Sequence, residues 1–321
     1  MLEKLKDYLA REIPLINAVL AKEIASLPPS ILEVAQHVLN AGGKRLRPFL
    51  VLLMARALGY AKEDVYPLAC ALEIFHSATL IHDDVLDEAE LRRGQTASHI
   101  QFGNKRAILA GDGLLALGNL IVARYNNPLL TQVVSEAILA TAYGEIEEIA
   151  FSKNKIDKET YFRIISGKTA YLIQAACECG AILSGSEDLV LAAKSYGFNL
   201  GVAFQLIDDV LDYTQSHEIM GKPQLGDLRE GKITLPLIYY VETLSLAEQE
   251  EFWEKFFSFS FEEEELEEIL LTIKEKEISE RVKTEAKAYL DKARKSLEAF
   301  PESKEKEILN SILTYIVERE K

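Results

Sequence analysis

Apolar residues recur at every third or fourth position along most of the chain, which is the spacing of one face of an α-helix. A first helix is predicted to begin near Leu2 and to end at the SLPPS break at 26–30, because Leu5, Leu9 and Ile13 keep this spacing and prolines stop it. Further helices are predicted at 49–58, 64–86, 105–126, 129–150, 158–183, 187–216, 232–243, 246–257, 262–275, 279–298 and 302–319. No stretch alternates apolar and polar residues with β-branched enrichment, so we expect no sheet.

Two segments, 66–86 and 187–211, are apolar on all sides and are therefore expected inside the protein. The more polar helices would surround them. We predict an all-α fold in a single domain over residues 1–321, with central helices ringed by amphipathic ones. No window approaches the roughly 18 to 20 uninterrupted apolar residues of a membrane-spanning helix, so no membrane span is expected.

Composition narrows the class of protein. Apolar residues make up 48 % and charged residues 27 % of the 321 residues, as in ordinary globular proteins. The formal net charge of −15 argues against nucleic acid as a partner, because proteins that bind nucleic acid concentrate positive charge. The N-terminal residues lack the apolar core of a signal peptide, and an odd count of 3 cysteines does not indicate a disulfide framework. We expect a cytoplasmic protein.

An aspartate-rich pattern occurs in two copies, HDDVLD at 82–87 and IDDVLD at 207–212. Residues four apart share a helix face, so each copy stacks its first and last carboxylates, with the middle one beside them. The carboxylates are those of Asp83, Asp84, Asp87, Asp208, Asp209 and Asp212. Stacked carboxylates repel one another, and Mg²⁺ with substrate phosphate oxygens is the natural counter-charge. The alternatives are a helix-terminal or surface feature and a di-iron site, which would use Glu and Glu-x-x-His.

Basic residues gather beside these motifs. GGKRLRP at 42–48 places Lys44, Arg45 and Arg47 at a predicted helix start, where backbone N–H groups also favour anions. Arg92 and Arg93 directly follow the first aspartate motif. Each residue alone is typical of a surface charge. Together, in so acidic a chain, they indicate two diphosphates, one bound through metal and one bound directly by Lys, Arg and His.

These motifs resemble those of the trans-isoprenyl diphosphate synthases, or polyprenyl synthetases. The resemblance is carried by GGKRLRP, HDDVLDEAELRRG at 82–94, GKT at 167–169, FQLIDDVLD at 204–212 and KPQLGDLREGKITLP at 222–236. It implies the all-α isoprenoid synthase fold with a deep central cavity, and usually a homodimer. It also implies the head-to-tail condensation of an allylic diphosphate with isopentenyl diphosphate.

The resemblance further implies a role for each matching residue. The six aspartates would bind roughly three Mg²⁺ ions per active site, in keeping with the preference of Mg²⁺ for carboxylates and phosphates. Isopentenyl diphosphate would be bound by Lys44, Arg47, His76 and Arg93. The allylic diphosphate would be bound by Arg92, Lys168, Thr169, Gln205, Lys222 and Lys232. Of these, Lys168, Thr169 and Gln205 are the predicted catalytic residues, and Thr169 and Gln205 would direct oxygen dipoles at the carbocation.

Product length is expected to depend on the side chains that precede Asp83 on its helix. Ala78 stands where short-chain members of the family carry a bulky aromatic residue, and the candidate residues for product length are Ala78, Thr79, Ile74 and Phe75. We therefore expect a product of about C30 to C50, since the depth of a cavity limits its ligand. Octaprenyl diphosphate is favoured over heptaprenyl diphosphate, made from farnesyl or geranylgeranyl diphosphate for a quinone side chain. Product release is expected to involve transient membrane contact.

Other functions remain open from the sequence. A geranylgeranyl or farnesyl diphosphate synthase is the alternative within the same family. A non-catalytic subunit of a heteromeric synthase would have eroded aspartate motifs, whereas both are intact here. Terpene cyclases and head-to-head synthases would not need GGKRLRP and the Arg92–Arg93 pair for a second diphosphate. A helical scaffold protein would leave the aspartates within apolar segments unexplained.

Overall fold

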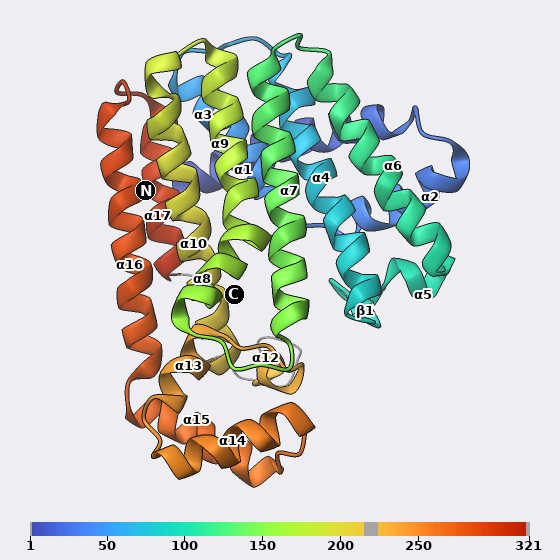
Figure 1. Ribbon diagram of the computed structural model, residues 1–321. Coiled ribbons are helices and arrows are strands. Elements are labelled where there is room, and N and C mark those ends of the chain that lie inside the picture. The colour runs from blue at the N-terminus through green and yellow to red at the C-terminus, as the bar shows by residue number, and fades with distance from the viewer. Residues whose placement is uncertain (1, 215–223, 319–321) are drawn as a thin grey trace. The chain divides into compact units, whose positions relative to one another are not determined.

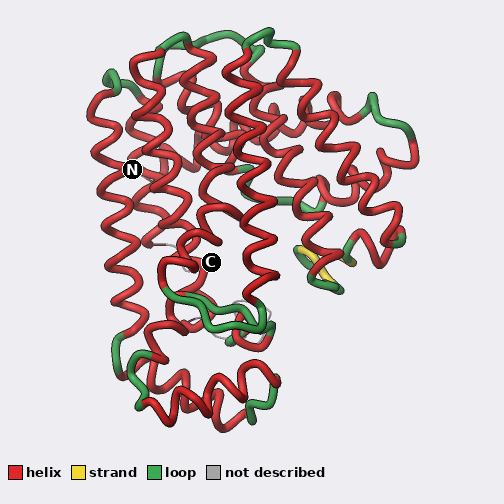
Figure 2. The backbone as a smooth tube through the Cα atoms, viewed as in Figure 1, coloured by secondary structure: helices red, strands yellow, loops and turns green. Residues whose placement is uncertain are grey.

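Helices account for nearly all the regular structure of the chain (Figures 1 and 2). The computed structural model describes residues 2–214 and 224–318. The elements up to residue 123 are α1 (Leu2–Ile24), α2 (Pro29–Asn40), α3 (Leu46–Ala57), α4 (Val65–Leu86), β1 (Leu91–Arg92), β2 (Gln95–Thr96), α5 (Ser98–Phe102) and α6 (Asn104–Ala123). The all-α prediction is confirmed.

The rest of the chain continues in the same manner. The next elements are α7 (Pro128–Phe151), α8 (Lys158–Ile165), the π-helical turn η1 (Ser166–Ala170), α9 (Tyr171–Ser184), η2 (Glu187–Leu189) and α10 (Val190–Thr214). They are followed by α12 (Gly226–Arg229), α13 (Leu235–Val241), α14 (Leu246–Ser258), α15 (Glu263–Glu275), α16 (Ile278–Ser296), η3 (Leu297–Ala299) and α17 (Lys304–Glu318). The helices predicted from apolar spacing match most of these, but α2, α5 and α12 were not predicted, and the predicted helix at 158–183 is divided by η1. The predicted ends at 215–216 and 319 lie outside the described residues.

The chain divides into two compact units. The first comprises Met1–Ile138, Leu172–Lys194 and Ala299–Ser311, and the second comprises Leu139–Tyr171, Ser195–Glu298 and Ile312–Lys321. The first aspartate motif and GGKRLRP belong to the first unit, and the GKT and IDDVLD motifs belong to the second. That the chain forms one domain stays a prediction.

Helix α4 is the centre of the first unit. It packs against α1, α3 and α6, and its apolar residues are almost wholly buried, as its lack of a polar face predicted. Helix α6 passes close to it because Gly118 leaves room for the ring of Phe75; a Cβ at Gly118 would lie 2.5 Å from Phe75 Cε1. By length and composition α6 is apolar enough to span a membrane, with a mean hydropathy of 1.5 over a window that is 44 % buried. A core helix has the same composition, and α6 is a neighbour of α2, α4 and α5.

A small hairpin is the one departure from the expectation of no sheet within residues 2–214 and 224–318. Leu91 pairs with Thr96 and Arg92 with Gln95, in antiparallel register. Arg93 and Gly94 form the turn, with φ of 52° and 76°, which is the left-handed geometry of a two-residue hairpin turn. Strands of two residues are too short to show an alternating pattern, so periodicity could not reveal them.

In the second unit, glycine allows η1 to lie very close to its neighbours. A Cβ at Gly201 of α10 would lie 2.6 Å from Ala170 Cα, and a Cβ at Gly144 of α7 would lie 2.7 Å from the backbone nitrogen of Lys168. Gly167 lies against the same stretch of α7, where its Cβ would be 2.8 Å from the carbonyl oxygen of Ala140. Side chains at these three positions would push η1 away from both helices. The backbone that carries Lys168 and Thr169 is therefore held from two sides.

Candidate active site

The first aspartate motif lies at the C-terminal end of α4. Asp83 and Asp84 are in its last turn, and Asp87 caps the helix with its N–H donated to the carbonyl oxygen of Asp83 at 2.8 Å. The C-terminus of a helix carries partial negative charge, so carboxylates there add to an unfavourable field. Arg92 of the hairpin relieves part of it, because its Nε donates to Asp84 Oδ1 at 2.6 Å. The short hairpin is thus what returns a positive charge to the end of α4.

Two glycines and Arg93 connect the GGKRLRP loop to the hairpin. The Arg93 guanidinium donates to the carbonyl oxygen of Gly42. At Gly43 a Cβ would lie 2.7 Å from Arg93 Nη1 and would push the guanidinium away, and the φ of 143° also favours glycine there. The sequence predicted Lys44 and Arg93 as ligands of one diphosphate, and the structure brings Arg93 against the residues that precede Lys44.

Arg47 and His76 form the interior of this basic cluster. Among the described residues, Arg47 Nε is buried without a hydrogen-bond partner. Burial lowers the pKa of Arg47 to about 10. Burial, with the positive charges of Arg47 and Arg93, holds the pKa of His76 well below its usual value, so the imidazole is neutral near pH 7 and can donate one hydrogen bond. A buried unsatisfied donor is rare in proteins and indicates a missing partner, which an anionic oxygen would supply.

The second aspartate motif lies near the C-terminal end of α10, where a chain of hydrogen bonds leads to the catalytic candidates. Thr169 Oγ1 donates to Gln205 Oε1 at 2.9 Å, and Gln205 Nε2 donates to Asp209 Oδ1 at 2.8 Å. The other oxygen of Asp209 accepts from the hydroxyl of Tyr161 on α8 at 2.5 Å. The structure thus joins Thr169 and Gln205, which were predicted, to Tyr161, which was not. A tyrosine on the apolar face of an amphipathic helix looks like a core residue from the sequence alone.

Asp212 accepts hydrogen bonds from backbone groups at the start of α12. Its two oxygens accept from the N–H groups of Gly226 and Asp227, both at 3.1 Å. This brings a further carboxylate, Asp227, into the cluster. Burial and the charge of Asp212 raise the pKa of Asp227 to about 7, and burial with the charge of Asp227 raises that of Asp209. Crowded carboxylates whose pKa values rise in this way are a favourable place for a cation.

Lys168 projects toward two carboxylates that the sequence analysis did not single out. Its Nζ lies 3.1 Å from Glu145 and is also bonded to Glu148, both on α7. Burial opposes the charge of Lys168, but these two carboxylates outweigh it and raise its pKa. Lys232 Nζ donates to Glu230 at 2.9 Å. Lys222 lies outside the described residues.

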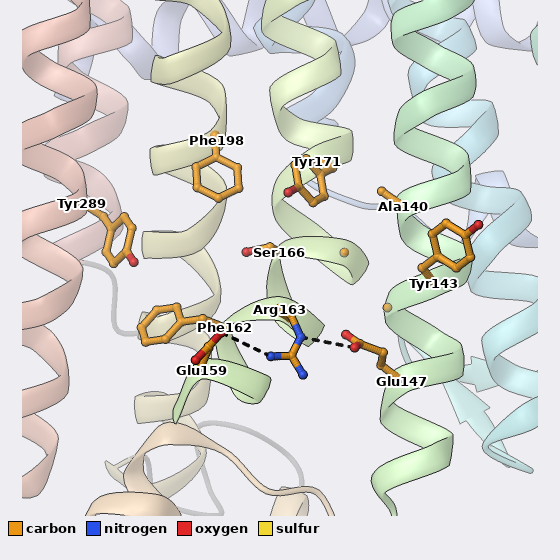
Figure 3. A pocket seen from close by; sticks show the side chains of 12 residues that line it. Ala140, Tyr143, Glu147, Glu159, Phe162, Arg163, Ser166, Tyr171, Phe198 and Tyr289 are labelled. Atoms are coloured by element: carbon orange, nitrogen blue, oxygen red, sulfur yellow. Dashed lines mark hydrogen bonds and ion pairs between the residues drawn. The ribbon is translucent and has the colours of Figure 1, made fainter. Parts of the chain in front are cut away.

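A pocket of about 540 Å³ lies in the second unit on α7, α8, η1, α9, α10 and α16 (Figure 3). Aromatic rings line it, and Arg163 at its edge is bonded to Glu147 and Glu159. Ser166 and Gly167, which directly precede the catalytic candidates Lys168 and Thr169 in η1, contribute to its wall. No residue predicted to bind substrate lines it.

The candidate residues for product length belong to the first unit. Ile74, Phe75 and Ala78 are completely buried in α4, and the hydroxyl of Thr79 donates to the carbonyl oxygen of His76 at 2.9 Å. The ring of Phe75 is directed at Gly118 of α6. A larger side chain at position 78 would therefore have to displace packed atoms or fill space that a ligand uses.

The donors at both aspartate motifs fit Mg²⁺ in kind. They are carboxylate oxygens at the negative ends of two helices, without the sulfur or imidazole ligands that softer metals prefer. In residues 2–214 and 224–318, no group of three His, Cys, Asp or Glu side chains has the arrangement of a complete metal site. Mg²⁺ usually keeps waters and takes substrate phosphate oxygens, so a partial protein ligand set suits it.

Comparison with known proteins decides the family. The model of the family described as polyprenyl synthetase matches residues 28–273. The chain belongs to the polyprenyl synthetase family. It is 36 % identical over 318 residues to heptaprenyl diphosphate synthase component 2 of Bacillus subtilis (strain 168), covering 98 % of this chain and 89 % of that protein.

Relatives with other products are nearly as similar. The geranylgeranyl diphosphate synthase of Methanosarcina mazei is 34 % identical over 303 residues, which is 91 % of each chain. The crystal structure of a decaprenyl diphosphate synthase from Rhodobacter capsulatus superposes with a TM-score of 0.92 at 35 % identity, covering 99 % of both chains. The resemblance found in the motifs is confirmed, as is the isoprenoid synthase fold, and this polyprenyl synthetase is a prenyltransferase.

Gly144→Ala tests whether the position of Lys168 depends on the close approach of η1 to α7. The added Cβ would displace the Lys168 backbone, and we expect kcat to fall about tenfold or more, since small misplacements of catalytic groups are costly. Gly113→Ala is the matched control, because its Cβ would meet only the flexible end of Ile31, at 3.0 Å. Steady-state kinetics and thermal unfolding check both variants. Equal kinetic losses in the two variants would contradict this prediction.

Proposed function

We propose that this polyprenyl synthetase makes an all-trans medium- or long-chain product, with octaprenyl diphosphate favoured, by adding successive isopentenyl diphosphates to an allylic diphosphate. Farnesyl and geranylgeranyl diphosphate are the proposed primers, and a quinone side chain is the proposed use of the product. The observation that carries the reaction is Arg47, whose buried Nε lacks a partner among the described residues beside His76. It supports a site for a second diphosphate that binds without metal.

The residues of this chain divide the work of the reaction. Lys44, Arg47, His76 and Arg93 would hold isopentenyl diphosphate so that its double bond faces the allylic carbon. Arg92, Lys168, Lys222 and Lys232 would bind the allylic diphosphate and stabilise the charge that it gains as the carbon–oxygen bond breaks. Thr169 and Gln205 would direct their oxygen atoms at the allylic cation. The buried apolar helices on which these residues lie would keep water from capturing that cation.

Mg²⁺ is the proposed cofactor, with roughly three ions in each active site, because Mg²⁺ prefers carboxylate and phosphate oxygens as ligands. Asp83, Asp87 and Asp208 would be direct ligands. Asp84, Asp209 and Asp212 would support them, since Asp84 already accepts from Arg92 and Asp209 from Tyr161 and Gln205. When bound, Mg²⁺ neutralises the leaving diphosphate.

Product length rests on the small buried side chain of Ala78, five residues before Asp83 on α4. The absence of an aromatic ring at this position supports a chain longer than C20. The relatives named above make products from geranylgeranyl to decaprenyl diphosphate by their names, so a geranylgeranyl or farnesyl product is the alternative. A non-catalytic subunit of a heteromeric synthase is a further alternative, against which the two intact aspartate motifs argue. The relative from Bacillus subtilis is named as a component of a synthase.

We further propose that the protein is a cytoplasmic homodimer. It would contact the membrane transiently when it releases its product. Helix α7 supports the dimer. Its residues Leu139, Tyr143, Ile146 and Ile149 are 53 %, 61 %, 61 % and 54 % exposed, and their spacing forms one apolar stripe. Helix α6 has its own exposed apolar residues, Ile108, Leu109 and Leu120. Contiguous exposed apolar surface is typical of a face that another chain covers.

Product analysis tests the reaction directly. Purified protein with Mg²⁺, labelled isopentenyl diphosphate and farnesyl diphosphate is expected to give mainly products of about C40, the length proposed from the cavity argument. Chromatography of the dephosphorylated products against prenol standards measures this. The matched reaction with EDTA in place of Mg²⁺ should give none. Products that end at C20 would refute the chain length, and no elongation at all would refute an independently active synthase.

Ala78→Phe tests whether the product grows past α4. We expect shorter products, with Ala78→Leu intermediate, because the larger side chain closes the space that the prenyl chain fills. Ala69→Phe is the matched control: Ala69 is equally buried in α4, but nine residues away and therefore on the opposite face, about 180° around the helix. Both Phe variants should lose stability from overpacking. An unchanged product length in the two Ala78 variants would contradict the prediction.

The dimer is tested by the molar mass of the protein in solution. Light scattering is expected to give twice the 36.0 kDa of one chain. Ile146→Glu should shift the mass toward the monomer, because it buries an unpaired charge in the proposed interface. Glu250→Lys, a charge change on α14, is the control and should remain a dimer. A monomeric wild-type protein would rule out the homodimer.

A further inference from the structure

Arg45 stands between two residues that were assigned to isopentenyl diphosphate, yet it turns away from solvent. It occupies the N-cap of α3 with φ of 48° and ψ of 37°, the left-handed conformation that residues other than glycine seldom adopt. Its side chain is only 7 % exposed. The backbone conformation thus directs Arg45 into the protein while the chain passes through Lys44 and on to Arg47.

All three nitrogens of the Arg45 guanidinium are engaged. Nη1 donates to Glu73 Oε1 at 2.8 Å, Nη2 to the carbonyl oxygen of Leu39 at 2.5 Å, and Nε to Asn17 Oδ1 at 3.2 Å. These partners come from α4, α2 and α1. The loop that carries Lys44 is therefore attached at one point to three helices of the first unit.

Glu73 connects this attachment to the rest of the basic cluster. Its side chain is 3 % exposed, and it lies one turn before His76 on α4, so the two residues share a helix face. Burial lowers the pKa of both Arg47 and Arg93, and the charge of Glu73 opposes that lowering. Burial also lowers the pKa of His76, and the charge of Arg45 contributes to this. Glu73 is thus the carboxylate that balances this group of guanidiniums.

Stability alone is a poor reason for such a pair. Removing two charges from water costs about as much free energy as their attraction returns. Apolar residues of similar size at a buried site therefore usually give the folded protein equal or greater stability. A buried ion pair instead fixes a geometry, because any shift of either partner leaves a charge unpaired. This distinction is what an experiment can measure.

We infer that Arg45 and Glu73 are a positioning pair, which holds Lys44, Arg47 and His76 in the arrangement that binds the diphosphate of isopentenyl diphosphate. Neither residue would touch the substrate. Arg45 sets the course of the loop, and Glu73 sets the turn of α4 that carries His76. The inference rests on the proposed function, since it takes from there the identity of the ligand.

The chain offers a matched control in the Glu12–Arg56 pair. This pair also lies in the first unit, with Arg56 Nη1 2.7 Å from Glu12 Oε1 and the Glu12 side chain 2 % exposed. Its partners Tyr8 and Tyr66 join α1, α3 and α4 but belong to no proposed ligand set. Glu12→Gln and Glu73→Gln therefore remove the same charge from comparable surroundings.

The test measures the Kd of isopentenyl diphosphate by calorimetry, the KM of each substrate, and the midpoint of thermal unfolding. We expect Glu73→Gln to raise the Kd and KM of isopentenyl diphosphate about tenfold or more, as displaced charge-assisted hydrogen bonds would, and to change the KM of farnesyl diphosphate far less. Glu12→Gln should lower the unfolding midpoint and leave both KM values unchanged. Equal effects of the two variants on isopentenyl diphosphate would overturn the inference.

A double variant and a conservative variant separate positioning from folding. Arg45→Met with Glu73→Met removes both charges together, so it should unfold near the wild-type temperature yet still bind isopentenyl diphosphate weakly. Arg45→Lys keeps the charge but loses the planar fork and should recover only part of the affinity. Wild-type affinity in the double variant would overturn the inference. If the wild-type protein binds isopentenyl diphosphate but makes no elongated product, the proposed reaction is refuted. The role of the Arg45–Glu73 pair is then still tested by the Kd of isopentenyl diphosphate in the variants.

Discussion

Carboxylates gathered at the C-terminal ends of helices must be balanced by positive charge. The dipoles of α4 and α10 place partial negative charge where Asp83, Asp87 and Asp212 lie. Burial, together with repulsion between neighbouring carboxylates, raises the pKa values of Asp209 and Asp227. The two-residue turn of the hairpin brings Arg92 back to the end of α4, where it neutralises part of this negative charge by bonding to Asp84. The remaining imbalance is what a divalent cation and its diphosphate would correct.

Exact placement of the basic residues depends on backbone approaches that only glycine permits. Gly43 admits the guanidinium of Arg93, while Gly144, Gly167 and Gly201 let η1 lie against its two neighbouring helices. A π-helical turn is uncommon and is often retained at functional sites, and here it includes Lys168 and Thr169. These glycines thus leave steric room, and the neighbouring charged residues take the positions that this room allows.

The fold was predictable because helical periodicity is a local property of the sequence. The importance of the aspartate motifs was predictable because charges in an apolar segment are costly to bury unless a counter-charge is present. The partners of those charges were not. Nothing in the sequence pairs Tyr161 with Asp209 or the charged Glu73 with Arg45. Glu145 and Glu148 are typical of a solvated face, and only the structure shows that they contact Lys168. Each such pair joins residues far apart in the chain. The hairpin was missed for a different reason, since its direction is set by the left-handed Arg93 and Gly94 and not by any pattern of apolar residues.

The basic residues proposed to bind the allylic diphosphate are already paired with carboxylates, whereas those proposed to bind isopentenyl diphosphate are not to the same extent. This difference affects which diphosphate needs metal. Arg92 is bonded to Asp84, Lys168 to Glu145 and Glu148, and Lys232 to Glu230, so an allylic diphosphate would have to compete with carboxylates for each of them. In the other cluster Arg93 donates to a neutral carbonyl oxygen, His76 is uncharged, and Arg47 retains an unsatisfied buried donor among the described residues. Glu73 balances that cluster through Arg45 without occupying Arg47. An anion therefore gains direct contacts in one cluster, whereas in the other it gains little unless it brings its own positive charge, which is the role that Mg²⁺ is proposed to have.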